Sequence, residues 1–177
     1  VAICNNIEIF SFRDGLGSDS AQVGAPQTSR NYAWRDYGNR VGQWYLFDLL
    51  DEMGLPASHN FNSLLFDHCP AIADRMIASG DEFIGHGRSN AERQDLLPPE
   101  KEEALIREAY DAITSYTGTA PAGWLGPYLA QTDITLDLLR EVGFSYVLDW
   151  PADDQPFWMR TRSRADPVRA LFHRAER

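Results

Sequence analysis

The chain has 177 residues, of which 44% are hydrophobic and 24% charged, which suffices for one globular domain with a buried core. Its formal net charge of −10 argues against nucleic acid or an anionic membrane as a partner, because both repel an acidic surface. No run reaches the ~18 apolar residues of a membrane span and no signal-like segment opens the chain, so we expect a cytoplasmic protein. The two cysteines, Cys4 and Cys69, form no CxxC pair and are expected to be buried free thiols.

The first half of the chain alternates between strand and helix patterns. Residues 1–12 predict a strand whose polar residues lie in its C-terminal half, and the polar segment 13–31 predicts a loop. Apolar residues at helical spacing predict a helix over 32–53, which a glycine ends. A short strand over 57–65 and a helix over 70–79 that begins with proline follow.

The second half continues the alternation. A short strand over 82–85 precedes an amphipathic helix over 98–116 that has acidic residues in its first turn. Residues 123–128 predict a passage from strand to loop, residues 132–142 a helix, and residues 144–149 an apolar strand. Strands and helices that alternate about every thirty residues place the chain in the α/β class, with a parallel sheet or barrel wrapped by helices.

Several candidate site residues fall near predicted strand ends. In parallel α/β folds the functional side chains gather at the carboxyl ends of the strands. We therefore expect five residues from separate segments to meet at one mouth: Glu8, Asn60, His86, Trp124 and Asp149.

Glu8 and His86 are the strongest candidates for chemistry. A carboxylate at the end of an apolar strand is costly to bury unless it is hydrogen-bonded or functional, so Glu8 is either a general base or an exposed strand-end acid. Glycines flank His86 on both sides, which leaves its ring open to a ligand, although a single histidine is often structural. His59 and His68 are further histidines, but the spacings between the histidines do not define a metal site with three ligands.

A group of acids follows the last predicted strand in the segment DWPADDQP. Asp149, Asp153 and Asp154 are candidates to bind a metal, orient a histidine or hold polar substrate groups, and the alternative is a solvated turn. The chain has no GxGxxG, P-loop, GxSxG or HExxH motif, so the classes of nucleotide enzyme, serine hydrolase and zinc protease that those motifs define are excluded.

Five segments together resemble the polysaccharide-deacetylase superfamily: NNIEIF, WRDYGNRVGQW, EFIGHGRSN, TGTAPAGWLGPY and EVGFSYVLDWPADDQPFWMR. They are most similar to its branch of metal-independent allantoinases and cyclic imide hydrolases. The resemblance covers residues 1–162 and implies a distorted seven-stranded TIM-like (β/α) barrel, present here as an incomplete catalytic barrel. Residues 163–177 form an atypical Arg-rich tail without a strand pattern, which resembles a shifted reading frame or a truncation.

The resemblance also implies roles for individual residues. Ile9 and Asn90 stand where the family's deacetylases have metal ligands, and Leu125 stands where they have an arginine. The resemblance therefore implies catalysis without a bound metal, and the alternative is that zinc or another divalent metal is bound. Glu8 would activate water, His86 would polarise the carbonyl or act as the acid, and Asp149 would complete the catalytic set. The implied substrate-binding residues are Asn60, Asn90, Trp124, Tyr128, Trp150 and Asp154.

The function expected on this basis is hydrolysis of a non-peptide carbon–nitrogen bond, in an amide, a cyclic imide or an N-acyl group of a small molecule. One alternative is a metal-dependent carbohydrate N-deacetylase with substituted ligands, and another is an inactive barrel remnant that only binds a ligand or partner. The aromatic-rich helix around residues 32–50 is expected to carry more apolar surface than one incomplete barrel can bury, which is compatible with a homo-oligomer.

Overall fold

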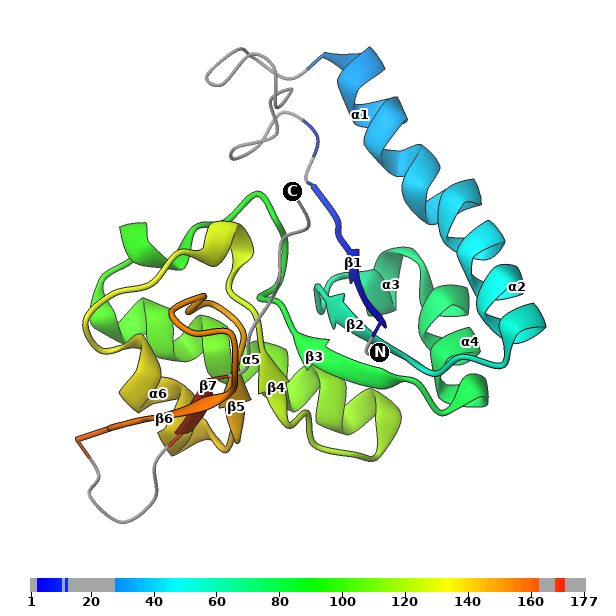
Figure 1. Ribbon diagram of the computed structural model, residues 1–177. Helices are drawn as coiled ribbons and strands as arrows, with labels where there is room; N and C mark the ends of the chain where they lie inside the picture. The colour runs from blue at the N-terminus through cyan, green and yellow to red at the C-terminus, as the bar shows by residue number, and fades with distance from the viewer. Residues whose placement is uncertain (1–2, 11, 13–27, 163–167, 171–177) are drawn as a thin grey trace.

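The computed structural model describes residues 3–10, 12, 28–162 and 168–170. Seven strands in these ranges form one sheet in the order β1-β2-β3-β4-β5-β7-β6 (Figure 1). All neighbouring pairs are parallel except β6 and β7, which are antiparallel. The expected α/β fold is confirmed, and over the described ranges the sheet does not close into a barrel. The strands are β1 (Ile3–Ile7), β2 (Ala57–Phe61), β3 (Glu82–Gly85), β4 (Gly123–Trp124), β5 (Tyr146–Val147), β6 (Phe157–Met159) and β7 (Val168–Ala170).

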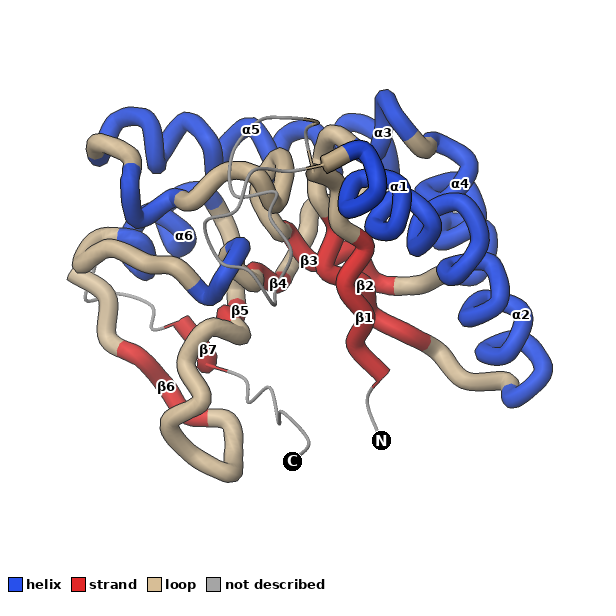
Figure 2. The backbone as a smooth tube through the Cα atoms, turned by 90° about the horizontal axis from the view of Figure 1, so that it is seen from above, coloured by secondary structure: helices blue, strands red, loops and turns tan. Residues whose placement is uncertain are grey.

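The helices lie along one side of the curved row of strands, as Figure 2 shows. The α-helices are α1 (Ser29–Tyr37), α2 (Gln43–Met53), α3 (Leu65–His68), α4 (Pro70–Ser79), α5 (Pro99–Thr117) and α6 (Thr135–Val142). A π-helix, η1 (Gly38–Gly42), joins α1 to α2, and two short 3-10 helices are η2 (Gln94–Leu96) and η3 (Pro127–Leu129). None of the helices in the described ranges is long and apolar enough to cross a membrane.

The structure differs from the sequence-based prediction at the start of the first helix and in the tail. The first helix begins at Ser29 rather than at residue 32, because the Thr28 hydroxyl accepts the Asn31 N–H and caps the helix. Most of the predicted loop, residues 13–27, lies outside the described residues. The tail also contains a strand, β7, so the expectation that it lacks one was wrong. Three residues are too few to show a periodicity in the sequence.

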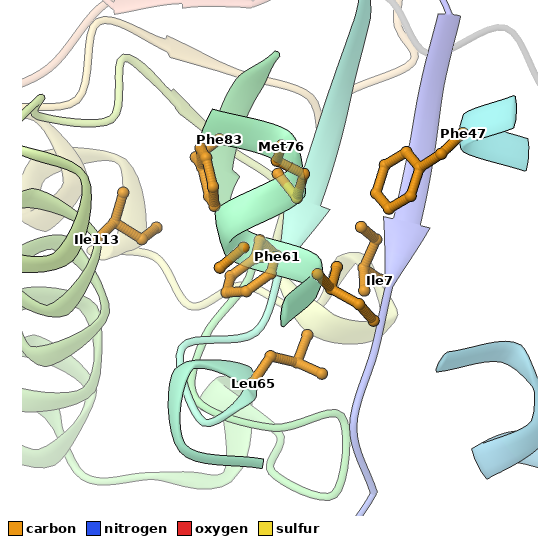
Figure 3. Packing of buried hydrophobic residues seen from close by; sticks show 9 residues of the cluster. Ile7, Phe47, Phe61, Leu65, Met76, Phe83 and Ile113 are labelled. Carbon is orange, nitrogen blue, oxygen red and sulfur yellow. The ribbon is translucent and has the colours of Figure 1, made fainter. Parts of the chain in front are cut away.

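The hydrophobic core forms where alternate strand residues face the helices. Ile7, Phe61 and Phe83 come from three neighbouring strands and pack against α2, α4 and α5 (Figure 3). The Phe61 and Phe83 rings meet edge to face, with centroids 5.2 Å apart. A second cluster joins α5 and α6 to β4 and β5. These two clusters fix the positions of the strand ends that carry the site.

The other face of the same strands is polar. Glu82 of β3 accepts hydrogen bonds from the Ser58 hydroxyl at 2.8 Å and from the Tyr146 hydroxyl at 2.7 Å. Cys4 is on this face and is exposed, and Cys69 is half-buried between α3 and α4, so the expectation of two buried thiols was wrong. Cys4 is exposed because β1 is an edge strand of an open sheet.

Candidate functional site

Glu8 and His86 lie together because neighbouring strands end at the same level. In the parallel register Ile7 pairs with Phe61, and Phe61 pairs with Gly85. The next residues of β1 and β3 therefore leave the sheet at the same level, on either side of the end of β2. The carboxylate Oε1 of Glu8 lies 3.4 Å from Nε2 of His86, and the His86 ring is buried.

A buried asparagine between these two strands holds both ends in place. The Asn62 side-chain oxygen accepts the N–H of Ile9 at 2.8 Å, and its amide nitrogen donates to the carbonyl oxygen of His86. Asn90 continues the connection, since its backbone N–H donates to the Ile9 carbonyl at 2.9 Å. Position 9 therefore contributes its backbone to the site, while its side chain packs against the core.

The surroundings of His86 define which ring nitrogen carries hydrogen. Nδ1 faces the carbonyl oxygen of Leu125, which can only accept, so Nδ1 is the donor. Nε2 then faces the Glu8 carboxylate, and two lone pairs at 3.4 Å repel each other unless a proton lies on one of them. Apart from Glu8, Nε2 has no polar partner in the described part of the chain. The pair is therefore arranged to hold one exchangeable proton.

The Glu8 carboxylate is kept ionised by its neighbours. Burial alone would raise the pKa of Glu8, but hydrogen bonding and positive charge from His86, with the amides of Asn6 and Asn90, outweigh it, so the pKa lies below its ordinary value. Asn6 donates to Glu8 Oε1 at 3.1 Å and is itself held by the buried Asn60, which donates to Asn6 Oδ1 at 2.6 Å. Asn60 thus acts on Glu8 through Asn6.

Asp149 follows β5 and is buried. One carboxylate oxygen accepts the Gly126 N–H at 2.7 Å and the other accepts the side-chain amide of Gln131. Burial raises the pKa of Asp149 to about 6, although these two hydrogen bonds and the charge of His86 act in the opposite direction. Both oxygens are engaged with the loop after β4, so Asp149 positions that loop and acts on His86 over a distance.

The other expected site residues are not all near this pair. Trp124 is fully buried in the cluster of α5, α6 and Phe144, on the helix side of the sheet. Trp150 and Asp154 lie in the segment between β5 and β6, and both are exposed. Burial raises the pKa of Tyr128, on which the charges of Arg35 and Glu8 also act. Its backbone is left-handed, with φ 62°, a conformation that a non-glycine residue adopts at a cost.

A polar cavity next to Glu8 contains residues that sequence reasoning missed. It measures about 290 Å³ and lies between the end of β1 and the π-helix, lined in part by Arg35, Asn39 and Gln43. The Asn39 amide donates to the backbone oxygen of Glu8 at 2.8 Å. The two glycines of the segment GNRVG were the signal in the sequence, because glycines inside a helix often mark a close approach or a functional irregularity.

A second cavity, of about 370 Å³, lies at the other end of the strands, where β3 begins and α5 ends. Its lining does not include Glu8. We therefore take the cavity beside Glu8 as the candidate site.

The donor atoms of the described residues do not fit the metal site that the family's deacetylases use. Within the described ranges no three histidine, cysteine, aspartate or glutamate side chains gather at metal-binding distances. Beside Glu8 and His86 stand the aliphatic side chain of Ile9 and the amide of Asn90, and neither replaces a carboxylate or an imidazole as a strong ligand.

Comparison with known proteins shows a similarity to one enzyme family. A family model described as polysaccharide deacetylase matches residues 33–147. A peptidoglycan deacetylase from Helicobacter pylori is 24% identical over 146 residues, which are 82% of this chain and 48% of that protein. The chain spans about half the length of this curated relative.

Two solved structures share the fold. Puue allantoinase superposes with a TM-score of 0.81 and 22% identity, covering 98% of this chain and 61% of that one. A probable polysaccharide deacetylase from Pseudomonas aeruginosa PAO1 superposes with a TM-score of 0.79 and 22% identity, with the same coverage.

Proposed function

Because the chain belongs to the polysaccharide deacetylase family, we propose that it hydrolyses a non-peptide carbon–nitrogen bond of the amide type, with Glu8 as general base and His86 as general acid. The observation that carries the proposal is the contact between these two side chains at the ends of β1 and β3. A base that is ionised and an acid that can donate a proton, on adjacent groups, are what amide hydrolysis requires.

The proposed reaction begins with a water molecule beside Glu8. The carboxylate takes a proton from the water, whose oxygen attacks the carbonyl carbon of the substrate. His86 then donates the hydrogen on Nε2 to the leaving nitrogen as the carbon–nitrogen bond breaks. The products are a carboxylic acid and an amine or amide. Transfer of the proton from Glu8 to His86, across 3.4 Å, restores the starting state.

The fixed tautomer of His86 supports this assignment. The Leu125 carbonyl holds the Nδ1 hydrogen, so only Nε2 is available to exchange a proton with substrate. The proposed reaction uses no metal ion, because the donor atoms of the described residues around Glu8 do not form a metal-binding site. The proposed substrate is a small amide, cyclic imide or N-acyl compound, and no cofactor is required.

The test uses the full chain and the isosteric variant Glu8→Gln. We expect the wild type to hydrolyse at least one member of a panel of linear amides, cyclic imides and N-acetyl sugars, and the variant to lose about 100-fold or more in kcat/KM. Glu103→Gln, which removes an exposed carboxylate on α5, is the matched control and should retain full activity.

Two results would contradict the proposal. Equal activity of Glu8→Gln and wild type would remove Glu8 from the reaction. Activity that appears only with added zinc and disappears on chelation would favour the metal-dependent deacetylase instead.

A further inference from the structure

The cavity beside Glu8 is built as a binding pocket. Its volume is about 290 Å³, which is the size of a small metabolite. Glu8 and Phe10, which follow β1, line it, and the remaining lining comes from β1, from α1 and from the π-helix and start of α2. Gly38 and Gly42 of the π-helix also line it, and a Cβ at either position would meet nothing within 4 Å. The absence of these two side chains keeps the space open.

A chain of hydrogen bonds fixes the orientation of one polar group in this pocket, the side-chain amide of Gln43. Asp81 lies 3.3 Å from Nε2 of the buried His59, which makes Nε2 the donor and leaves Nδ1 as an acceptor. Asn5 Nδ2 lies 3.4 Å from that Nδ1 and donates to Gln43 Oε1 at 2.7 Å. Because the side-chain oxygen of Gln43 accepts this hydrogen bond, its NH2 group is the part of the amide that can donate to a ligand.

That NH2 group is a buried donor in need of an acceptor. Gln43 is 7% exposed, and its Nε2 has no hydrogen-bond partner within the part of the chain that the structure describes. Gln43 lines the pocket. Buried polar groups are almost always hydrogen-bonded, so a donor left over beside a cavity indicates a place where an acceptor atom binds.

Arg35 adds positive charge to the same pocket. Its guanidinium lies over the Phe10 ring, 4.0 Å from the centroid, and both residues line the cavity. Glu8 is the negative group of the lining, so an anionic ligand atom is stabilised near Arg35 and repelled near Glu8. The lining of the pocket therefore carries both the proposed base and a cationic group.

We propose that this pocket binds the non-reacting end of the substrate, through an oxygen of a carboxylate or carbonyl group that accepts hydrogen bonds from Gln43 Nε2 and from Arg35. The inference rests on the proposed hydrolase function and adds the class of substrate: a small amide that carries a second, preferably anionic, acceptor group. An uncharged, purely aliphatic amide leaves the Gln43 donor unsatisfied, gains nothing from the charge of Arg35, and is bound less tightly.

The test compares two amides that differ at the non-reacting end, succinamate with its carboxylate and butyramide with a methyl group in that place. Binding to the full wild-type chain is measured by calorimetry and hydrolysis by release of ammonia. We expect succinamate to bind at least about tenfold more tightly than butyramide and to show the same preference in kcat/KM, through KM.

Two variants assign the preference to the two donors. Gln43→Glu keeps the acceptor for Asn5 and replaces the free NH2 with an oxygen, so it should repel the carboxylate and abolish the preference. Arg35→Met should reduce the preference about tenfold, and Arg35→Lys should restore part of it. Arg107→Met, on the exposed face of α5, is the control and should leave the preference unchanged.

The two proposals fail in different ways. If succinamate binds with this preference but neither amide is hydrolysed under any condition, the pocket assignment stands and the hydrolase proposal is contradicted for these amides. If hydrolysis occurs but the two amides bind equally well, or the preference survives Gln43→Glu, the pocket assignment is overturned and the hydrolase proposal remains.

Discussion

Asn62 donates a hydrogen bond to the backbone oxygen of His86 and accepts one from the N–H of Ile9, so one side chain connects the ends of β1 and β3. One of these backbone groups belongs to His86, and the other belongs to Ile9, the residue after Glu8. The separation of 3.4 Å between the proposed base and acid therefore depends on a buried residue that contacts neither of their reacting atoms.

Asn62→Ala should impair both stability and activity. The substitution leaves two buried backbone groups without partners, which costs about 1–3 kcal/mol in the free energy of unfolding. It should also lower kcat more than it raises KM, because the two strand ends lose their alignment. Urea unfolding and steady-state kinetics measure the two effects. Asn62→Asp retains the acceptor and should recover part of the loss through the Ile9 N–H. Activity as low in Asn62→Asp as in Asn62→Ala would argue against this bond.

Gly85 precedes His86 and admits no side chain. A Cβ there would lie 2.9 Å from the Trp124 ring and 3.1 Å from the Phe144 ring, both of which are buried. Gly85→Ala should therefore lower the free energy of unfolding by about 1–3 kcal/mol. Gly38→Ala is the matched control, since Gly38 has a helical backbone and open space around its Cβ position, and it should be neutral or slightly stabilising. Thermal unfolding of both variants is the measurement, and an equal shift in the two would refute the steric explanation.

Most of the fold followed from the sequence because strand and helix periods alternate clearly. Residues 82–85 were predicted and found as a strand, since a short apolar run lies there between glycines. The π-helix was not predicted, because apolar spacing cannot separate one π turn from the α-helix around it. Only the structure shows that this turn places Asn39 on the backbone of Glu8.

The candidate site was only partly predictable, because strand ends were visible in the sequence and side-chain directions were not. Trp124 was expected at the mouth, but β4 turns it toward the helices and turns Leu125 to the other face. Arg35 and Gln43 lie on helices, far from any strand end in sequence, so a search of strand ends could not find them.

Glu102 illustrates a buried carboxylate with a structural role. It is 0% exposed, and its two oxygens accept hydrogen bonds from the hydroxyls of Thr132 and Thr135, which ties α5 to the start of α6. Thr135→Val should cost about 1–3 kcal/mol, because Glu102 loses a donor and the Thr132 N–H loses its acceptor. Thr114→Val, which removes a hydroxyl bonded only to the Tyr110 carbonyl of its own helix, should cost less. Equal losses in urea unfolding would show that Glu102 does not depend on Thr135.

Asp149 should make the protein less stable as the pH rises from about 4 to about 7. Burial raises the pKa of this carboxyl from 3.8 to about 6, so the folded chain binds a proton that the unfolded chain has already released. The folded state therefore loses stability through this interval, and a pKa difference of this size corresponds to roughly 3 kcal/mol.

The variant Asp149→Asn isolates that contribution. Its oxygen can still accept the Gly126 N–H, and Gln131 can turn its side-chain oxygen, which has no partner in the described residues, toward the new amide. The free energy of unfolding of the variant minus that of the wild type should then increase by roughly 2 kcal/mol between pH 4 and pH 7, which is most of the full effect. All other carboxylates, including Glu8, are shared by the two chains and cancel in this difference. Asp111→Asn, at an exposed site on α5, shows the effect of the same substitution without burial. A difference for Asp149→Asn that stays constant from pH 4 to pH 7 would mean that Asp149 is ionised in the folded chain throughout, and the loop after β4 would then be held by a carboxylate at every pH tested.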